Sequence, residues 1–188
     1  MQPVVLTTER LVLEVPTLDD VDRIVEYCRD PLFERWLTTP WPYEWHHATG
    51  WVKGLVPGWH EDRELTWALR TESGGELLGV VGVTLGTPDR PAGMIGFWLG
   101  GPHRGFGYMP EAARAAIDWV FAQGLLDEIL WEAVVPNRAS LIVARKLGFT
   151  YTGTRQADIV GRDGDRPSSW HAVLGRDDDR GVKAGWPE

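Results

Sequence analysis

The segment Gly100-Gly-Pro-His-Arg-Gly-Phe-Gly-Tyr108 constrains the fold of this chain most, because it stands between a strand pattern and a helix pattern. The apolar residues 94–99 predict the strand, and Pro110 suits the first position of a helix that Gly124 ends. The first amides of a helix have no internal partner, and glycine lets a backbone approach an anion closely. The segment fits neither GxxxxGKS/T nor GxGxxG with a distant acid. By itself it therefore indicates either an anion site or a simple glycine-containing connection.

Apolar periodicity and turn signals divide the rest of the chain into strands and helices. Thr17 and Asp20 predict a capping box at the start of a helix that Pro31 ends or bends. The order β-α-α-β-β-β-α-β-α-β-β predicts an α+β fold, with one twisted mixed sheet of about seven strands and helices on both faces. The predicted strands are residues 9–15, 65–71, 77–85, 94–99, 125–135, 149–160 and 170–174, the main helices are 18–30, 46–59, 110–123 and 138–147, and turns fall at 73–75, 88–93 and 161–167.

Length and composition indicate one globular domain of ordinary size. The chain has 188 residues, of which 43% are hydrophobic and 24% are charged. No linker divides it, so we expect a single domain over residues 1–175. Asp177, Asp178 and Asp179 lie near glycine and proline, which predicts an acidic and poorly ordered tail over residues 176–188.

Charge and cysteine content exclude several classes of protein. The net charge of −8 at pH 7 argues against a nucleic-acid binder, which needs a basic face. No apolar run approaches the ~20 residues of a membrane span, and the first residues show no signal peptide. Cys28 is the single cysteine, which excludes internal disulfides and cysteine zinc sites and favours a reducing cytoplasm. No metal is expected, because no metal-ligand spacing appears among His46, His47, His60, His103 and His171.

A second motif opens with Asn137-Arg-Ala-Ser140 and closes with Arg145-Lys-Leu-Gly-Phe149. Together with Arg104-Gly-Phe-Gly-Tyr-Met-Pro-Glu-Ala112, it resembles the GNAT superfamily of acyl-CoA-dependent N-acyltransferases. The opening Leu6-Thr-Thr-Glu-Arg-Leu-Val-Leu13 resembles the ribosomal-protein alanine N-acetyltransferase branch, the RimJ/RimL-like proteins. The resemblance covers residues 5–175 and implies a GNAT-like sheet with acetyl-CoA, or another acyl-CoA, as co-substrate.

The resemblance implies a coenzyme site built mostly from backbone groups. The amides from Arg104 to Met109 would hold the pyrophosphate, and the strand before them would pair with the pantetheine arm. Asn137 would hydrogen-bond the pantetheine, although it is also a good helix N-cap, and Lys146 also suits a last helical turn. The implied cofactor-binding residues are Phe97, Trp98, Leu99, Arg104, Gly105, Phe106, Gly107, Tyr108, Met109, Asn137 and Lys146.

The candidate catalytic groups are few. Met94 and Ala144 stand where many members of the family carry a glutamate and a tyrosine. Acylation of an amine by a thioester needs a base for the amine and an acid for the leaving thiolate. Ser140 is the best candidate for the acid or for a water relay. Asp158 is the first candidate for the base and Glu132 the second, and each carboxylate could equally be a solvated edge residue.

Tryptophan is concentrated where GNAT proteins build their acceptor groove. Trp51 is expected to pack on a helix face, and the residues beside Pro40 could line an apolar or cation-binding pocket. The candidate acceptor-binding residues are Trp36, Trp41, Tyr43 and Trp45. An acidic protein with such a pocket suits a cationic amine, either a small molecule or a protein N-terminus.

The sequence thus predicts a cytoplasmic N-acyltransferase that transfers an acetyl group from acetyl-CoA to a primary amine, without nucleic acid or membrane partners. A homodimer is compatible with the sequence. Two alternatives stay open: a GNAT-fold enzyme that uses succinyl-CoA or a carrier-bound acyl group, and a coenzyme A-binding module without turnover. Phe106 and Met109 motivate the first, and the missing glutamate and tyrosine motivate the second.

Overall fold

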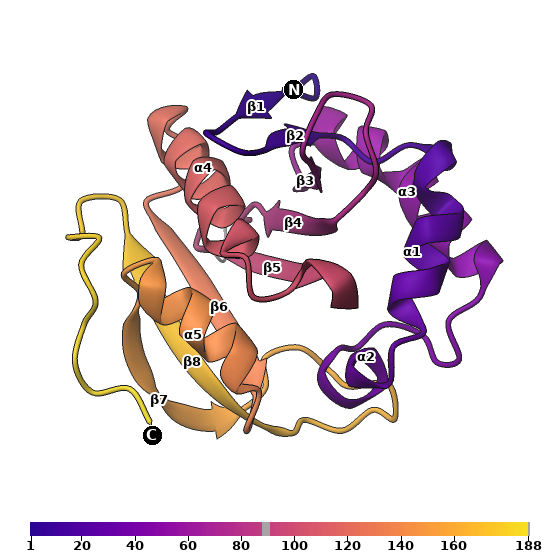
Figure 1. The fold of residues 1–188 in the computed structure, drawn as a ribbon. Helices are drawn as coiled ribbons and strands as arrows, with labels where there is room; N and C mark the ends of the chain where they lie inside the picture. Colours follow the sequence, from indigo (N-terminus) through magenta and orange to yellow (C-terminus); the bar gives the residue numbers. More distant parts are fainter. Residues whose placement is uncertain (88–90, 188) are drawn as a thin grey trace.

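The chain forms a mixed α+β fold in the computed structural model, which describes residues 1–87 and 91–187 (Figure 1). The described strands make one 8-stranded sheet in the order β1-β2-β3-β4-β5-β6-β8-β7. All neighbours in this sheet are antiparallel except β5 and β6, which are parallel. The strands are β1 (Leu6–Thr7), β2 (Val12–Glu14), β3 (Glu64–Arg70), β4 (Gly79–Thr84), β5 (Gly93–Leu99), β6 (Glu128–Val134), β7 (Thr150–Gln156) and β8 (Ser168–Gly175).

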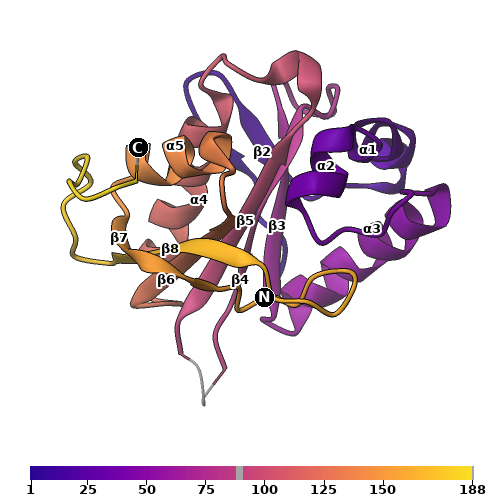
Figure 2. The ribbon, with the colours of Figure 1, turned by 90° about the horizontal axis from the view of Figure 1, so that it is seen from below.

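Helices cover both faces of the sheet, as the order of elements predicts. Figure 2 shows α1, α2 and α3 on one side of the strands and α4 and α5 on the other. The helices are α1 (Val21–Cys28), α2 (Pro31–Trp36), α3 (Trp45–His60), α4 (Tyr108–Ala122) and α5 (Arg138–Lys146), and two short 3-10 turns are η1 (Leu18–Asp20) and η2 (Gly101–His103). The α+β class and the mixed sheet are therefore confirmed.

The boundaries differ from the prediction at several places. The strand expected over residues 9–15 is the shorter β2, and an additional short strand, β1, precedes it, so the described sheet has 8 strands instead of about seven. The strand expected over 149–160 ends earlier, at Gln156. Pro31 begins a further helix, α2, because the Asp30 side chain accepts a hydrogen bond from the Leu32 amide and caps it. The helix expected from Pro110 begins at residue 108, since Gly107 adopts a left-handed conformation and forms its N-cap. The turn predicted at 88–93 lies partly outside the described residues.

Several local signals do set the ends of elements as expected. Thr17 and Asp20 form the predicted capping box, at the start of η1. Gly124 and Gly148 follow α4 and α5 with positive φ angles of 68° and 87°. Asn137 caps α5, where its Oδ1 accepts a hydrogen bond from the Ser140 amide at 3.3 Å. These ends position the loops that carry the candidate site.

The two central parallel strands separate along their length, and this opens the sheet. β5 and β6 each have 7 residues, yet they pair only at Gly93 with Ile129 and at Met94 with Leu130. Among residues 1–87 and 91–187, β5 beyond Met94 therefore has no strand partner on its β6 side. α4 packs over the sheet through fully buried small residues, Ala112, Ala113 and Ala116. The first turns of α4 and α5 then lie on either side of the opening (Figure 1).

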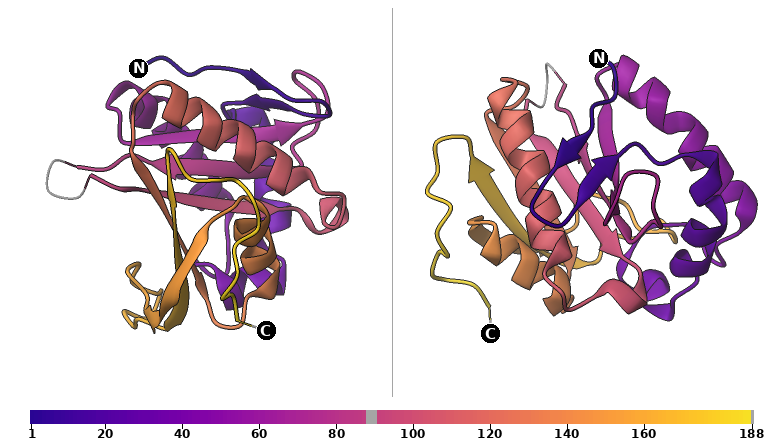
Figure 3. Two further views of the ribbon diagram at one scale, coloured as in Figure 1. Left: turned by 90° about the vertical axis from the view of Figure 1, so that its left-hand side faces the viewer. Right: turned by 45° about the horizontal axis from the view of Figure 1, so that its top comes forward.

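The C-terminal residues run back along the domain (Figure 3). The Arg180 guanidinium lies 5.2 Å from the Phe121 ring centroid and pairs with Asp118 at 3.2 Å. The Trp186 ring packs against Trp131 and Tyr151, with centroid distances of 5.8 and 5.5 Å. These contacts attach Arg180 and Trp186 to the domain, although the composition of this segment predicts poor order. None of the helices within residues 1–87 and 91–187 combines the length and apolarity of a membrane span.

Candidate active site

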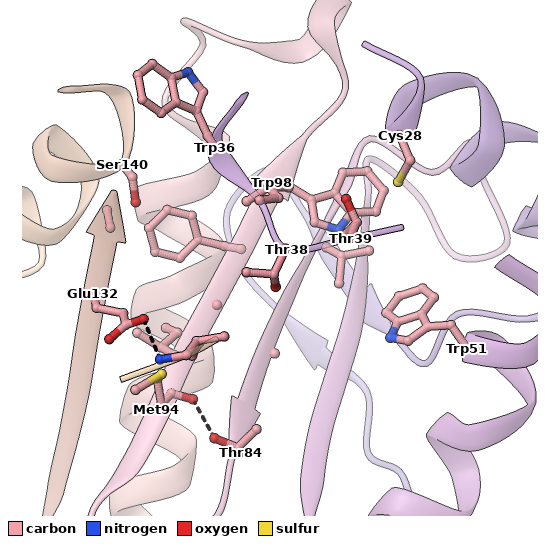
Figure 4. Close-up of a pocket in the computed structure, with 18 of the residues that line it drawn as sticks. Cys28, Trp36, Thr38, Thr39, Trp51, Thr84, Met94, Trp98, Glu132 and Ser140 are labelled. Carbon is pink, nitrogen blue, oxygen red and sulfur yellow. Dashed lines mark hydrogen bonds between the residues drawn. The ribbon is translucent and has the colours of Figure 1, made fainter. Parts of the chain in front are cut away.

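A cavity of about 750 Å³ lies between the sheet and the helices α1 to α3, and it reaches the opening between β5 and β6 (Figure 4). Its floor consists of three cross-strand rows of β3, β4 and β5, since alternate strand residues face the same side. The rows are Ala68–Val80–Trp98, Thr66–Gly82–Gly96 and Glu64–Thr84–Met94, and all of these residues but Ala68 line the cavity. The cavity is thus built directly on the central sheet.

Two glycines deepen the middle of this floor. Gly82 and Gly96 are register partners on β4 and β5, and both line the cavity. A Cβ atom on Gly96 would have no other atom within 4 Å, so the space above it is open. A larger residue at either position would fill the cavity from below.

Aromatic side chains form much of the wall. Trp98 is held by edge-to-face contacts with Phe33 and Tyr27, at centroid distances of 5.5 and 6.5 Å. Trp36 and Tyr43 line the cavity, as do Trp51 and Trp131. Burial raises the pKa of the Tyr43 hydroxyl, which keeps that group protonated.

Sequence reasoning thus located the tryptophan-rich wall but not all of its members. Trp41 and Trp45 are not among the lining residues, and Trp45 is 57% exposed. Their assignment to acceptor binding stays a prediction. Trp51 packs against the core, as expected for a helix face, and it also lines the cavity.

The cavity also holds the single cysteine. Cys28 lies at its edge and is 2% exposed. Burial raises the pKa of this thiol to about 12. The group is therefore a neutral thiol near pH 7, which does not suit it for nucleophilic catalysis.

The glycine-rich loop begins α4 with free backbone donors. Gly105 and Gly107 have φ angles of +87° and +80°, and no side chain caps the helix at Gly107. The first amides of α4 therefore lack an intrahelical partner and carry the positive end of the helix dipole. Phe106 is 61% exposed, whereas Met109 is buried at 3% and turns its side chain into the core. The loop offers its backbone to solvent, as an anion site requires.

Two arginines hold this loop. Arg104 donates from Nε to the Leu99 carbonyl at 3.1 Å and pairs with Asp30 at 2.8 Å, so its guanidinium ties the loop to the end of β5 and to α2. Arg10 donates to the Phe106 carbonyl at 2.9 Å and lies 5.0 Å from the Tyr108 ring centroid. The motif analysis did not assign a role to Arg10, because only the folded chain brings the β1–β2 turn to the loop.

Glu111 fixes Arg10 in place. Its carboxylate accepts hydrogen bonds from Arg10 Nε at 2.7 Å and from Thr8 Oγ1 at 2.6 Å. These hydrogen bonds lower the pKa of Glu111 against the raising effect of burial, which is the largest single influence on it. Arg10 is therefore held against the loop as one half of an ion pair with Glu111.

Ser140 lies at the inner end of the opening, in the first turn of α5. Its Oγ accepts a hydrogen bond from the indole Nε1 of Trp131 at 3.1 Å. Because that bond occupies an oxygen lone pair, the hydroxyl hydrogen stays available for donation. Ser140, Asn137 and Phe97 all line the cavity, so the structure brings these three predicted site residues together. Lys146 lies at the other end of α5, where its carbonyl accepts from Arg114 of α4 at 2.9 Å.

The two candidate bases lie next to each other but in different settings. Glu132 lines the cavity, and its side chain is 8% exposed. Its carboxylate accepts hydrogen bonds from the backbone amides of Asp158 at 2.8 Å and Ile159 at 3.1 Å (Figure 4). Asp158 does not line the cavity, and its carboxylate contacts Arg155 at 3.3 Å. Of these two candidate bases, Glu132 is the one that lines the cavity.

His171 completes this cluster. It is the cross-strand partner of Glu132, and its Nδ1 lies 3.7 Å from the Glu132 carboxylate. The side chains of Glu132, Asp158 and His171 each offer a potential ligand atom, and these atoms lie within 4.8 Å of one another. Sequence spacing did not indicate this group, because it depends on the register of β6 and β8.

Burial lowers the pKa of His171, and the nearby Arg155 lowers it further. The unfolded chain then binds a proton at higher pH than the folded chain does. Unfolding free energy should therefore rise with pH up to about pH 6.5, the ordinary value for histidine, and level off above it.

Thermal melts of the wild type and of His171→Gln between about pH 5 and pH 7.5 measure this effect, since the window brackets the ordinary histidine pKa. We expect a shallower rise of Tm with pH in the variant. An equal slope in both proteins would show that His171 does not contribute.

Comparisons with known proteins agree with this geometry. The family model described as an acetyltransferase (GNAT) domain matches residues 10–150. The uncharacterized N-acetyltransferase p20 of Bacillus licheniformis is 26% identical over 149 residues, which cover 79% of this chain and 83% of that protein. The chain belongs to the GNAT acetyltransferase family and is an N-acetyltransferase.

Solved structures share the fold at low sequence identity. The ribosomal-protein α-N-acetyltransferase RimL in complex with coenzyme A superposes with a TM-score of 0.79 at 20% identity, covering 94% of this chain and 100% of that one. The microcin C7 self-immunity acetyltransferase MccE, in complex with acetyl-CoA and AMP, gives a TM-score of 0.75 at 17% identity over 89% of this chain and 93% of that one. The predicted resemblance is confirmed at the level of family and fold.

Proposed function

We propose that the protein transfers an acetyl group from acetyl-CoA to a primary amine by direct attack on the thioester. The observation that carries the proposal is the uncapped start of α4 beside the unpaired edge of β5, with the cavity at the inner end of the same opening. The crystal complexes of RimL with coenzyme A and of MccE with acetyl-CoA support this choice of donor.

The residues of this chain fit such a donor. Gly105 leaves open space where a Cβ would stand, so a pyrophosphate can approach the amides of residues 105–109. The helix dipole adds positive charge there. The unpaired edge of β5 beyond Met94 offers backbone groups to the amides of a pantetheine arm. Bound acetyl-CoA would supply an activated carbonyl at the inner end of the opening.

Two residues of the cavity then have roles in proton transfer. Glu132 accepts the proton that the amine loses as its nitrogen bonds to the carbonyl carbon. Ser140, oriented by Trp131, passes a proton to the thiolate as the carbon–sulfur bond breaks and regains a proton from water, which also takes up the proton held by Glu132. Backbone amides of β5 polarise the carbonyl. The reaction needs no covalent enzyme intermediate, which agrees with the neutral, buried Cys28.

A thiol-release assay with acetyl-CoA and a panel of amines tests the proposal. Release that depends on both enzyme and amine supports it. Thermal shifts with acetyl-CoA, succinyl-CoA and free coenzyme A separate the alternatives. Turnover only with succinyl-CoA would indicate a different acyl donor, and stabilisation without turnover would indicate a binding module.

Ser140→Ala should lower kcat at least tenfold and leave the Kd for acetyl-CoA unchanged. A hydroxyl that protonates the leaving thiolate acts mainly in the transition state, where such assistance is typically worth 10²–10⁴-fold. Stopped-time thiol release gives kcat, and calorimetry gives Kd. Ser140→Cys retains a proton donor and should retain more activity than the alanine variant. If Ser140→Ala keeps the wild-type kcat, water and not Ser140 protonates the leaving thiolate.

A further inference from the structure

The cavity contains a carboxylate that the proposed chemistry does not use. Glu64, at the start of β3, is half-buried and lines the cavity together with Thr66 and Thr84. Thr66 Oγ1 donates to Glu64 Oε1 at 3.0 Å, which orients the carboxylate. In the described part of the chain, no lysine or arginine lies within salt-bridge distance of Glu64. A half-buried carboxylate without a cationic partner favours a cationic ligand.

Glu64 and Glu132 stand at opposite ends of the cavity. Cross-strand pairing runs from Glu64 to Thr84, from there to Met94, and then to Leu130, two residues before Glu132. The Cα atoms of Glu64 and Glu132 are therefore about 15 Å apart, because three inter-strand spacings and a two-residue offset along β6 separate them. The floor between them consists of Thr84, Met94 and the glycine pair, and the aromatic residues around it include Trp36, Trp51 and Trp98. An acceptor that reaches both carboxylates would therefore need an apolar body.

The size of the cavity suits a small-molecule acceptor. Arg162, in the β7–β8 connection, donates to the Thr39 carbonyl at 3.0 Å and to the Glu34 carbonyl. These bonds join two segments that both line the cavity, one through Thr39 and the other through Ile159. A cavity of about 750 Å³ is within the range of small-molecule sites.

We propose that the acceptor is a small diamine or similar dication with an apolar body. The amine at the Glu132 end is acetylated, and Glu64 holds the second cationic group. This inference rests on the proposed function and adds the substrate class. The acylated nitrogen gives its proton to Glu132 and the carbon–sulfur bond breaks as described above, while the second amine stays protonated throughout.

Two matched amines test the proposal in the thiol-release assay. Para-xylylenediamine and para-methylbenzylamine share a ring and one aminomethyl group, and differ in whether the second substituent is cationic. We expect the wild type to prefer the diamine at least tenfold in kcat/KM, as a charge-assisted contact predicts. Glu64→Gln should abolish this preference by raising KM for the diamine alone. Glu61→Gln, at an exposed carboxylate outside the cavity, is the control.

Three results would overturn the substrate class: equal use of both amines by the wild type, an equal effect of Glu64→Gln on both, or a peptide with a free N-terminus as a better acceptor than either. Calorimetry with para-xylylenediamine distinguishes this failure from failure of the proposed function. The wild type could bind the diamine, and Glu64→Gln could weaken this binding tenfold, while no amine gives thiol release. That result would overturn the proposed reaction and retain the proposed ligand class.

Discussion

Gly107→Val should raise the Kd for coenzyme A at least a hundredfold while the domain stays folded. Gly107 has a φ angle of +80°, which a β-branched residue does not adopt without strain. Relief of that strain would rotate the peptide groups at the start of α4, and these groups are the proposed pyrophosphate donors. Loss of two charge-assisted hydrogen bonds accounts for about 3 kcal/mol, which is a hundredfold change in affinity.

Gly124→Val is the matched control for this variant. Gly124 also has a positive φ, +68°, and a Cβ there would have no atom within 4 Å, but it lies at the opposite end of α4. The two variants should lose similar stability in thermal melts, and only Gly107→Val should lose coenzyme binding in calorimetry. If Gly107→Val binds coenzyme A with wild-type affinity, the loop is not part of the coenzyme site.

Glu132→Gln should lower kcat at least a hundredfold, with little change in the Kd for acetyl-CoA. The carboxylate is the acidic group at the Ser140 end of the cavity, and general-base assistance is typically worth 10²–10⁴-fold. Glutamine keeps the shape of the side chain and one acceptor oxygen. It removes the proton acceptor but still fills the space between β6 and the amides of Asp158 and Ile159.

Asp158→Asn separates the two candidate bases. Asp158 lies beside Glu132 but outside the cavity lining, so its variant should keep kcat within a few-fold of wild type. Single-turnover thiol release, with melts to check folding, compares both variants. A large loss in Asp158→Asn with near-normal Glu132→Gln would transfer the role of base to Asp158. Normal turnover in both would leave proton transfer to water.

The sequence alone determined the features that depend on a few neighbouring residues. Glycines between a strand pattern and a helix pattern predict a turn there. The structure shows positive φ angles at Gly105 and Gly107 and a helix that begins at Tyr108 without a side-chain cap. The cap at Asn137 and the helix ends at Gly124 and Gly148 are local in the same way. Such features follow from backbone sterics and hydrogen bonds within one turn, so a pattern in the sequence suffices to predict them.

Only the tertiary structure decided which side chains share the cavity. Periodicity placed Trp51 on an apolar helix face, but only the fold brought this residue to the cavity as well. The pairing of β6 with β8 set His171 opposite Glu132, and the pairing of β4 with β5 set the glycine floor. A shift of one residue would turn each of these side chains to the other face, and register depends on contacts between distant segments. The composition of the cavity therefore depended on the fold, whereas the backbone conformation of the glycine loop depended on local sequence.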